Sequence, residues 1–110
     1  MAQPHAESGQ IVSVLPLGDA LDRTVSTALL KAGQLEVMRI VLPLGKSMRE
    51  HQVAGEATLQ CIEGVVEFVI EGRTQHLRAG DFVHIAPRAV HALTAEQSAS
   101  LLLTVCLISA

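Results

Sequence analysis

Aromatic side chains are nearly absent from this chain of 110 residues, which has no Trp, no Tyr and only two Phe. The stacking platforms on which proteins hold nucleic-acid bases are therefore missing, and a carbohydrate site loses support for the same reason. Positive charge is scarce as well, because eight Lys and Arg face eleven Asp and Glu, a formal net charge of −3. Nucleic-acid binding depends on basic patches, so the composition argues against that class of partner.

Cysteine is also rare, and no apolar run is long. Cys61 and Cys106 each lie inside an apolar run, which favours buried thiols over a disulfide and fits a reducing cytoplasm. The first ten residues lack the basic and apolar pattern of a signal peptide. The apolar run at residues 101–108 is much shorter than the ~20 residues that span a bilayer. We therefore expect a cytoplasmic protein without a membrane segment.

The chain is rich in core-forming residues instead. Its hydrophobic fraction is 49% and its charged fraction 17%, which favours a filled globular core over disorder. At this length the chain should form one domain and bury roughly two thirds of its unfolded surface. We expect a mobile arm over residues 1–10 and a single domain over residues 11–110.

Short apolar runs, separated by glycine and small polar residues, predict an all-β fold. In the N-terminal half the predicted strands are Ile11–Leu17, Thr24–Leu30 and Leu35–Leu42, with a short helix over Leu21–Leu29 as the alternative to the second. In the C-terminal half they are Thr58–Ile62, Val65–Ile70, Arg73–Leu77, Phe82–Ala86, His91–Thr94 and Leu101–Leu107. Strands with turns this close together predict a sandwich or barrel without crossover helices.

Two histidines follow glycines near apolar runs. His51 comes six residues after Gly45, and His91 comes eleven residues after Gly80. On neighbouring strands of a small barrel the two side chains can meet inside it, and imidazole is the commonest metal-binding side chain. The pair therefore predicts a pocket, which either holds a metal or encloses two histidines that only form hydrogen bonds.

Residues 35–107 resemble a small single-domain cupin of the RmlC-like type. Gly45, His51 and Gly64 match the first sequence motif of that family, and Gly80 and His91 match the second. The resemblance implies a jelly-roll barrel, the double-stranded β-helix. It also implies a homodimer, because cupins of this size are usually dimers.

The metal ligands of the family are only partly retained. Cupin metal sites typically use three histidines and one glutamate, whereas this chain has Val53 at the second histidine position and Ala57 at the glutamate position. His51 and His91 remain as ligand candidates. If they hold a metal, the sequence does not separate iron, zinc, nickel and copper, and the alternative is that no metal binds.

Two more residues are candidates for the metal site. Glu56 lies one position before the expected glutamate, and a β-bulge at Gly55 would turn it toward the histidines to form a set of two histidines and one carboxylate. Without the bulge Glu56 is a solvated loop residue. His84 either points inward as a third ligand or lies on the outer face. The side chains expected to line the pocket are Met48, Val53, Ala57 and Cys61.

Two classes of function follow. The first is a module that binds a small molecule inside the barrel, and the loss of two ligand positions favours it. The second is a metal-dependent enzyme of the dioxygenase or isomerase type that acts on a small organic acid, with Arg49 or Arg88 at the rim of the pocket to hold a carboxylate. In either class we expect a homodimer formed through Ile11–Leu17 and the Thr24–Leu42 hairpin, since pairing across a two-fold axis covers an exposed strand edge.

Overall fold

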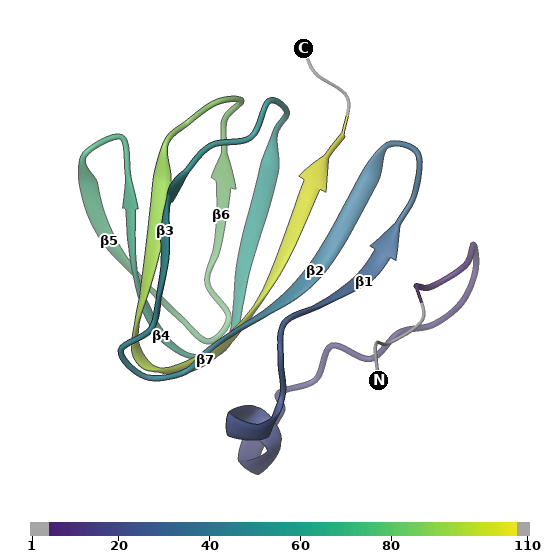
Figure 1. Cartoon of the computed structure of the whole chain (residues 1–110), viewed down its shortest axis with the longest axis horizontal. Coiled ribbons are helices and arrows are strands. Elements are labelled where there is room, and N and C mark those ends of the chain that lie inside the picture. The colour runs from purple at the N-terminus through teal and green to yellow at the C-terminus, as the bar shows by residue number, and fades with distance from the viewer. Residues whose placement is uncertain (1–4, 108–110) are drawn as a thin grey trace.

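The computed structural model describes residues 5–107, and its regular secondary structure is almost wholly β-strand, which confirms the all-β class (Figure 1). Its elements in chain order are the 3₁₀ helix η1 (Gly18–Arg23) and the strands β1 (Thr27–Lys31), β2 (Leu35–Leu42), β3 (Ser47–His51), β4 (Ala57–Ile70), β5 (Arg73–Arg78), β6 (Phe82–Ile85) and β7 (His91–Cys106). No helix among these residues is long and apolar enough to cross a membrane.

The strands form one hydrogen-bonded network that folds into two walls. One wall has the order β1-β2-β7-β4-β6 and the other the order β3-β7-β4-β5. The long strands β4 and β7 belong to both walls, because they run beside each other from the pair Ala57 and Val105 to the pair Ile70 and His91. The result is the jelly-roll barrel that the resemblance implied, and it opens at the end where β7 finishes (Figure 1).

Two pairs of predicted strands are therefore single strands. The register between β4 and β7 is irregular between Cys61 and Val66, where Gly64 has a φ of +81°. β-Bulges bend a strand and increase its local twist, and glycine adopts the positive φ that such a site requires. The bulged region lets each long strand continue from one wall into the other.

The prediction of a strand at Ile11–Leu17 is wrong, since no strand is found there. The helix considered for Leu21–Leu29 occurs only as η1, and β1 starts at Thr27. The polar strand Ser47–His51 was not predicted. By contrast, β2 has the predicted bounds Leu35–Leu42.

Arg39 shows why the segment before η1 is not a strand. The side chain projects from the outer face of β2, and yet Arg39 is only 7% exposed because residues 5–17, the N-terminal segment, cover it. Its guanidinium donates hydrogen bonds to the carbonyl oxygens of Leu15 at 2.8 Å and Ser13 at 3.4 Å. These carbonyl groups bond to a side chain in place of a neighbouring strand.

Glu63, in the bulged region of β4, holds the end of the same segment. Its carboxylate accepts hydrogen bonds from the backbone N–H groups of Leu17 at 2.8 Å and Gly18 at 3.0 Å, and from the Ser100 hydroxyl. Burial alone would raise the pKa of Glu63, but these hydrogen bonds and the nearby Arg39 outweigh it, so the pKa is lowered. The N-terminal segment is thus attached to the outside of the barrel by two charged side chains.

The core lies between the two walls and is apolar. Alternate residues of each strand point inward, as a two-residue period requires. The largest side chains with almost no exposed surface are Phe68, Leu59, Ile85, Leu101 and Val66. The cavity described next borders this core and shares Ile40 with it.

Candidate ligand cavity

The structure brings His51 and His91 together inside the barrel. His51 ends β3, His91 begins β7, and the two residues face each other in the β3–β7 register. Their ring centroids are 4.2 Å apart, with the ring planes tilted by 58°. The strand pairing therefore fixes the two imidazoles side by side.

Both histidines use the same ring nitrogen to bond to the backbone. Nδ1 of His91 lies 2.9 Å from the carbonyl oxygen of Ala89, and Nδ1 of His51 lies 3.1 Å from that of Arg49. A carbonyl oxygen only accepts hydrogen bonds, so Nδ1 carries the proton in each ring. In the neutral ring Nε2 then keeps its lone pair and can accept a hydrogen bond or bind a metal.

His91 is the more enclosed member of the pair. It is 4% exposed, and its ring centroid lies 6.2 Å from that of Phe68. Burial lowers the pKa of His91 and the neighbouring His51 lowers it further, while the hydrogen bond to Ala89 acts in the opposite direction. The site therefore favours the neutral imidazole.

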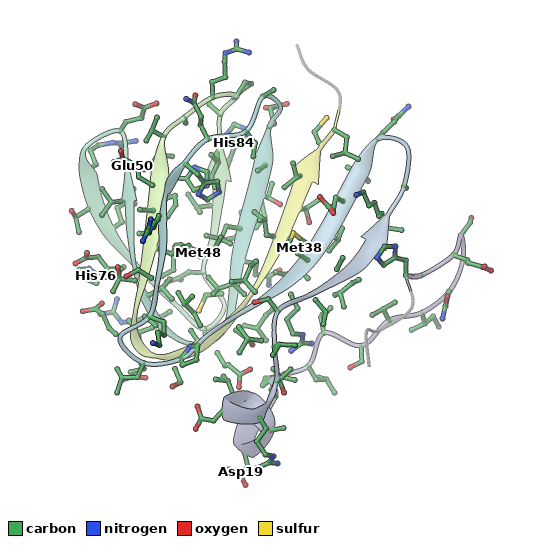
Figure 2. All side chains as sticks on the ribbon, viewed as in Figure 1. Asp19, Met38, Met48, Glu50, His76 and His84 are labelled. Carbon is green, nitrogen blue, oxygen red and sulfur yellow. The ribbon has the colours of Figure 1, made fainter. Side chains whose placement is uncertain are left out.

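A cavity of about 430 Å³ lies next to this pair, at the open end of the barrel. Its volume is within the range of about 300–1,000 Å³ that is usual for small-molecule pockets. Figure 2 labels Met38 and Met48, which line the cavity from β2 and β3, strands on opposite sides of the barrel. The cavity is lined by Glu36, Met38, Ile40, Met48, His51, Val53, Ala54, Gly55, Leu103, Val105, Cys106 and Leu107.

Glu36 is the charged residue of the lining, and the sequence did not predict it there. It shares the inward face of β2 with Met38 and Ile40, and it lies opposite Val105 in the β2–β7 register. Within residues 5–107 no side chain forms a hydrogen bond or ion pair with its carboxylate. The two-residue period of Leu35–Leu42 was the signal that could have placed it inside.

Glu56 and His84 lie elsewhere, on the outer face. Glu56 Oε1 is 2.8 Å from His84 Nε2, and the two side chains are 64% and 54% exposed. They border a shallow hollow of about 200 Å³ together with Ala57 and Thr58. The bulge proposed at Gly55 does not turn Glu56 toward the histidine pair. Figure 2 shows His84 on β6.

The remaining candidates are also placed by the structure. Met48 and Val53 line the cavity with His51, whereas the prediction that Ala57 and Cys61 line it is wrong, because both are buried in the core beside it. Burial raises the pKa of the Cys61 thiol, which donates hydrogen bonds to the carbonyl oxygens of Glu63 and Gly64. Such a thiol stays protonated and is a poor nucleophile. Arg49 and Arg88 are both exposed, and neither lines this cavity.

Two larger hollows lie beneath the N-terminal segment. Their volumes are about 580 and 490 Å³, and Leu29 borders both. No histidine lines either of them among the described residues. The barrel cavity is therefore the site where the sequence motif and the geometry coincide.

A metal site of the usual cupin kind does not fit these residues. His51 and His91 supply two nitrogen donors, but residues 5–107 contain no group of three or more His, Cys, Asp or Glu side chains that could hold a metal ion. Val53 and Ala57 present only apolar groups where the family has ligands. Two imidazoles alone give an open, weak site.

Comparison with known proteins identifies the family. The family model for the cupin domain matches residues 38–107. A conserved protein of unknown function from Streptococcus pyogenes has a similar structure, with a TM-score of 0.75, 20% sequence identity, and coverage of 100% of this chain and 97% of that one. An RmlC-like cupin with a double-stranded β-helix fold from Methanocaldococcus jannaschii gives a TM-score of 0.73 at 19% identity, covering 89% of this chain and 93% of the other.

One enzyme is also among the similar structures. Salicylate 1,2-dioxygenase from Pseudoaminobacter salicylatoxidans gives a TM-score of 0.63 at 24% identity, over 66% of this chain but only 20% of the enzyme's chain. No functionally curated protein matches the sequence. Structural similarity at such low sequence identity shows the fold alone and leaves the activity open. The family match and the jelly-roll structure together show that the chain belongs to the cupin family.

Proposed function

We propose that this cupin binds a small organic molecule in the barrel cavity. The observation that carries the proposal is the cavity itself, about 430 Å³ in volume, with mainly apolar walls and a few polar groups. Small-molecule sites have this composition, because apolar walls supply binding energy and a few polar atoms set the orientation. His51 and Glu36 are the ionisable nitrogen and oxygen groups in the lining.

A metal-dependent dioxygenase or isomerase is the second candidate. The structural likeness to a salicylate dioxygenase favours it, as does the pair of Nε2 atoms in His51 and His91. The available metal ligands argue against it, because within residues 5–107 no third His, Cys, Asp or Glu side chain joins the two histidines. Binding without a resident metal therefore remains our first proposal.

Methionine methyl groups provide the test of this proposal. Met38 and Met48 line the cavity, so protein labelled with ¹³C in the methionine methyl groups reports on its contents by NMR. On titration with 2-phenylethanol, a neutral probe with an apolar body, we expect saturable shifts of both signals. Met38→Leu and Met48→Leu assign the two signals.

Filling the cavity should abolish these shifts. We expect Val53→Phe, which adds a bulky side chain to the lining, to weaken probe binding by at least about tenfold, whereas the affinity of Leu44→Phe should stay within about twofold of the unmodified protein's. Leu44 is 65% exposed and does not line the cavity, so it is a matched control. Equal loss of binding in both variants, or no shift in the unmodified protein, would count against the proposed function.

We also propose that the chain forms a homodimer through its N-terminal region. Ile11, Leu15 and Val25 are 95%, 73% and 74% exposed, a large apolar exposure for a monomer's surface. β1 lies at the edge of its wall, where a second copy can add contacts. We expect multi-angle light scattering to give twice the 11.7 kDa chain mass, and Leu15→Arg to reduce it to one chain. A single-chain mass for the unmodified protein would contradict this proposal.

A further inference from the structure

The side chains that line the barrel cavity present hydrogen-bond acceptors rather than donors. Glu36 contributes a carboxylate, and His51 contributes Nε2, because its Nδ1 proton is donated to the Arg49 carbonyl oxygen. Met38 and Met48 add thioether sulfurs, which only accept. The one other polar side chain of the lining is Cys106, whose thiol is a weak donor at most. A ligand that satisfies these groups must itself carry donors.

The charge of the lining points the same way. It contains one carboxylate and neither Lys nor Arg. Arg49 and Arg88, the arginines expected to hold an organic acid, lie outside it. An anion in this cavity would face Glu36 without a lysine or arginine to compensate, whereas an organic cation would neutralise a carboxylate that has no ion-pair partner among the described side chains.

The polar groups are also placed at opposite sides. Glu36 is the second residue of β2, and His51 ends β3 across the cavity. Between them lie the apolar side chains of Met38, Met48 and Val53. This arrangement suits an apolar body with an N–H donor at one end.

We propose that the ligand class is a protonated amine on a small apolar body, with its ammonium group paired to Glu36. This inference rests on the proposed function, since it specifies what the same cavity prefers. The ammonium group donates charge-assisted hydrogen bonds to the carboxylate, which are stronger than hydrogen bonds between neutral groups. The apolar body contacts the methionine and valine side chains, and His51 Nε2 is free to accept a hydrogen bond from a further donor.

Three probes with one phenylethyl body separate charge from shape. These are 2-phenylethylamine, 2-phenylethanol and 3-phenylpropanoate. The protein is first dialysed against EDTA, so that no bound metal can coordinate the carboxylate of 3-phenylpropanoate. We expect the amine to bind at least about tenfold more tightly than the alcohol, as a charge-assisted hydrogen bond implies, and the carboxylate to bind more weakly than both. The methyl signals of Met38 and Met48 report binding of all three.

Two variants of Glu36 and one control assign the preference. Glu36→Gln should reduce the amine-to-alcohol affinity ratio below about twofold, and Glu36→Lys should reverse the order of amine and carboxylate. Glu50→Gln removes an exposed carboxylate of β3 that is outside the cavity lining, and it should keep the full ratio (Figure 2). If either Glu36 variant fails to fold, the other still gives the comparison.

The outcomes distinguish the two proposals. Binding of the alcohol without preference for the amine, or an amine preference that survives in Glu36→Gln, overturns the ligand class and leaves the cavity function intact. A carboxylate that binds as tightly as the amine does the same. Failure of all three probes to shift the methionine signals overturns the proposed function and this inference together.

Discussion

Replacing Gly64 with Ala is expected to lower the free energy of unfolding by about 3–5 kcal/mol. Gly64 has a φ of +81°, a conformation that residues with a Cβ adopt only at a cost. An added Cβ would also overlap the Ser98 carbonyl oxygen and lie 2.7 and 2.8 Å from Cα and Cβ of Ala99. These are backbone atoms and one Cβ of β7, so no change of side-chain rotamer can move them away.

Gly45→Ala is the matched control for this variant. Gly45 has the same φ of +81°, but nothing lies within 4 Å of the position of an added Cβ. Its cost should therefore be that of the backbone conformation alone, about 1–2 kcal/mol. Chemical denaturation of both variants measures the difference, which is the cost of the overlap with β7. Equal destabilisation of the two variants would show that β7 shifts freely at the bulge. That result would contradict the view that close packing of β4 and β7 at Gly64 joins the two walls.

Short apolar runs and turn residues in the sequence predicted most strands of this fold. The β-rich composition of Leu35–Leu42, which follows the turn at residues 31–34, predicted β2 at its observed bounds. The polar strand Ser47–His51 was missed because only Met48 and His51 are partly buried in it, too few to produce a pattern. The strand predicted for residues 11–17 was wrong for a different reason. Their conformation depends on Arg39 and Glu63, which are distant in sequence.

The candidate site was predicted in part for similar reasons. The glycine spacing of the motifs identified His51 and His91, and the structure places their rings 4.2 Å apart. The positions of Glu56 and His84 depended on which face of the strand each occupies, and a shift of one residue reverses the face. Glu36 lies outside the family motifs, which therefore do not predict its position. The two-residue period of β2 directs its carboxylate into the barrel.

Phe68→Ala is expected to have the other large effect, a loss of about 3–5 kcal/mol in the free energy of unfolding. Phe68 is fully buried, and its ring is the aromatic neighbour of His91, with centroids 6.2 Å apart. Truncation removes buried apolar surface and leaves a cavity in an interior that is close-packed. The chain has one other aromatic side chain, Phe82, and it lies on the outer face of β6, where it cannot fill the space.

Phe82→Ala and Phe68→Leu make the test of Phe68 decisive. Phe82 is 62% exposed, so its truncation should change the free energy of unfolding by no more than about 0.5 kcal/mol. Phe68→Leu keeps most of the volume, should cost less than about 1.5 kcal/mol, and remains measurable if Phe68→Ala does not fold. Equal values for the two alanine variants would mean that the interior next to His91 relaxes around the lost ring. The packing that holds the His91 ring beside His51 would then be loose, whereas a ligand site depends on packing that holds its polar groups in place.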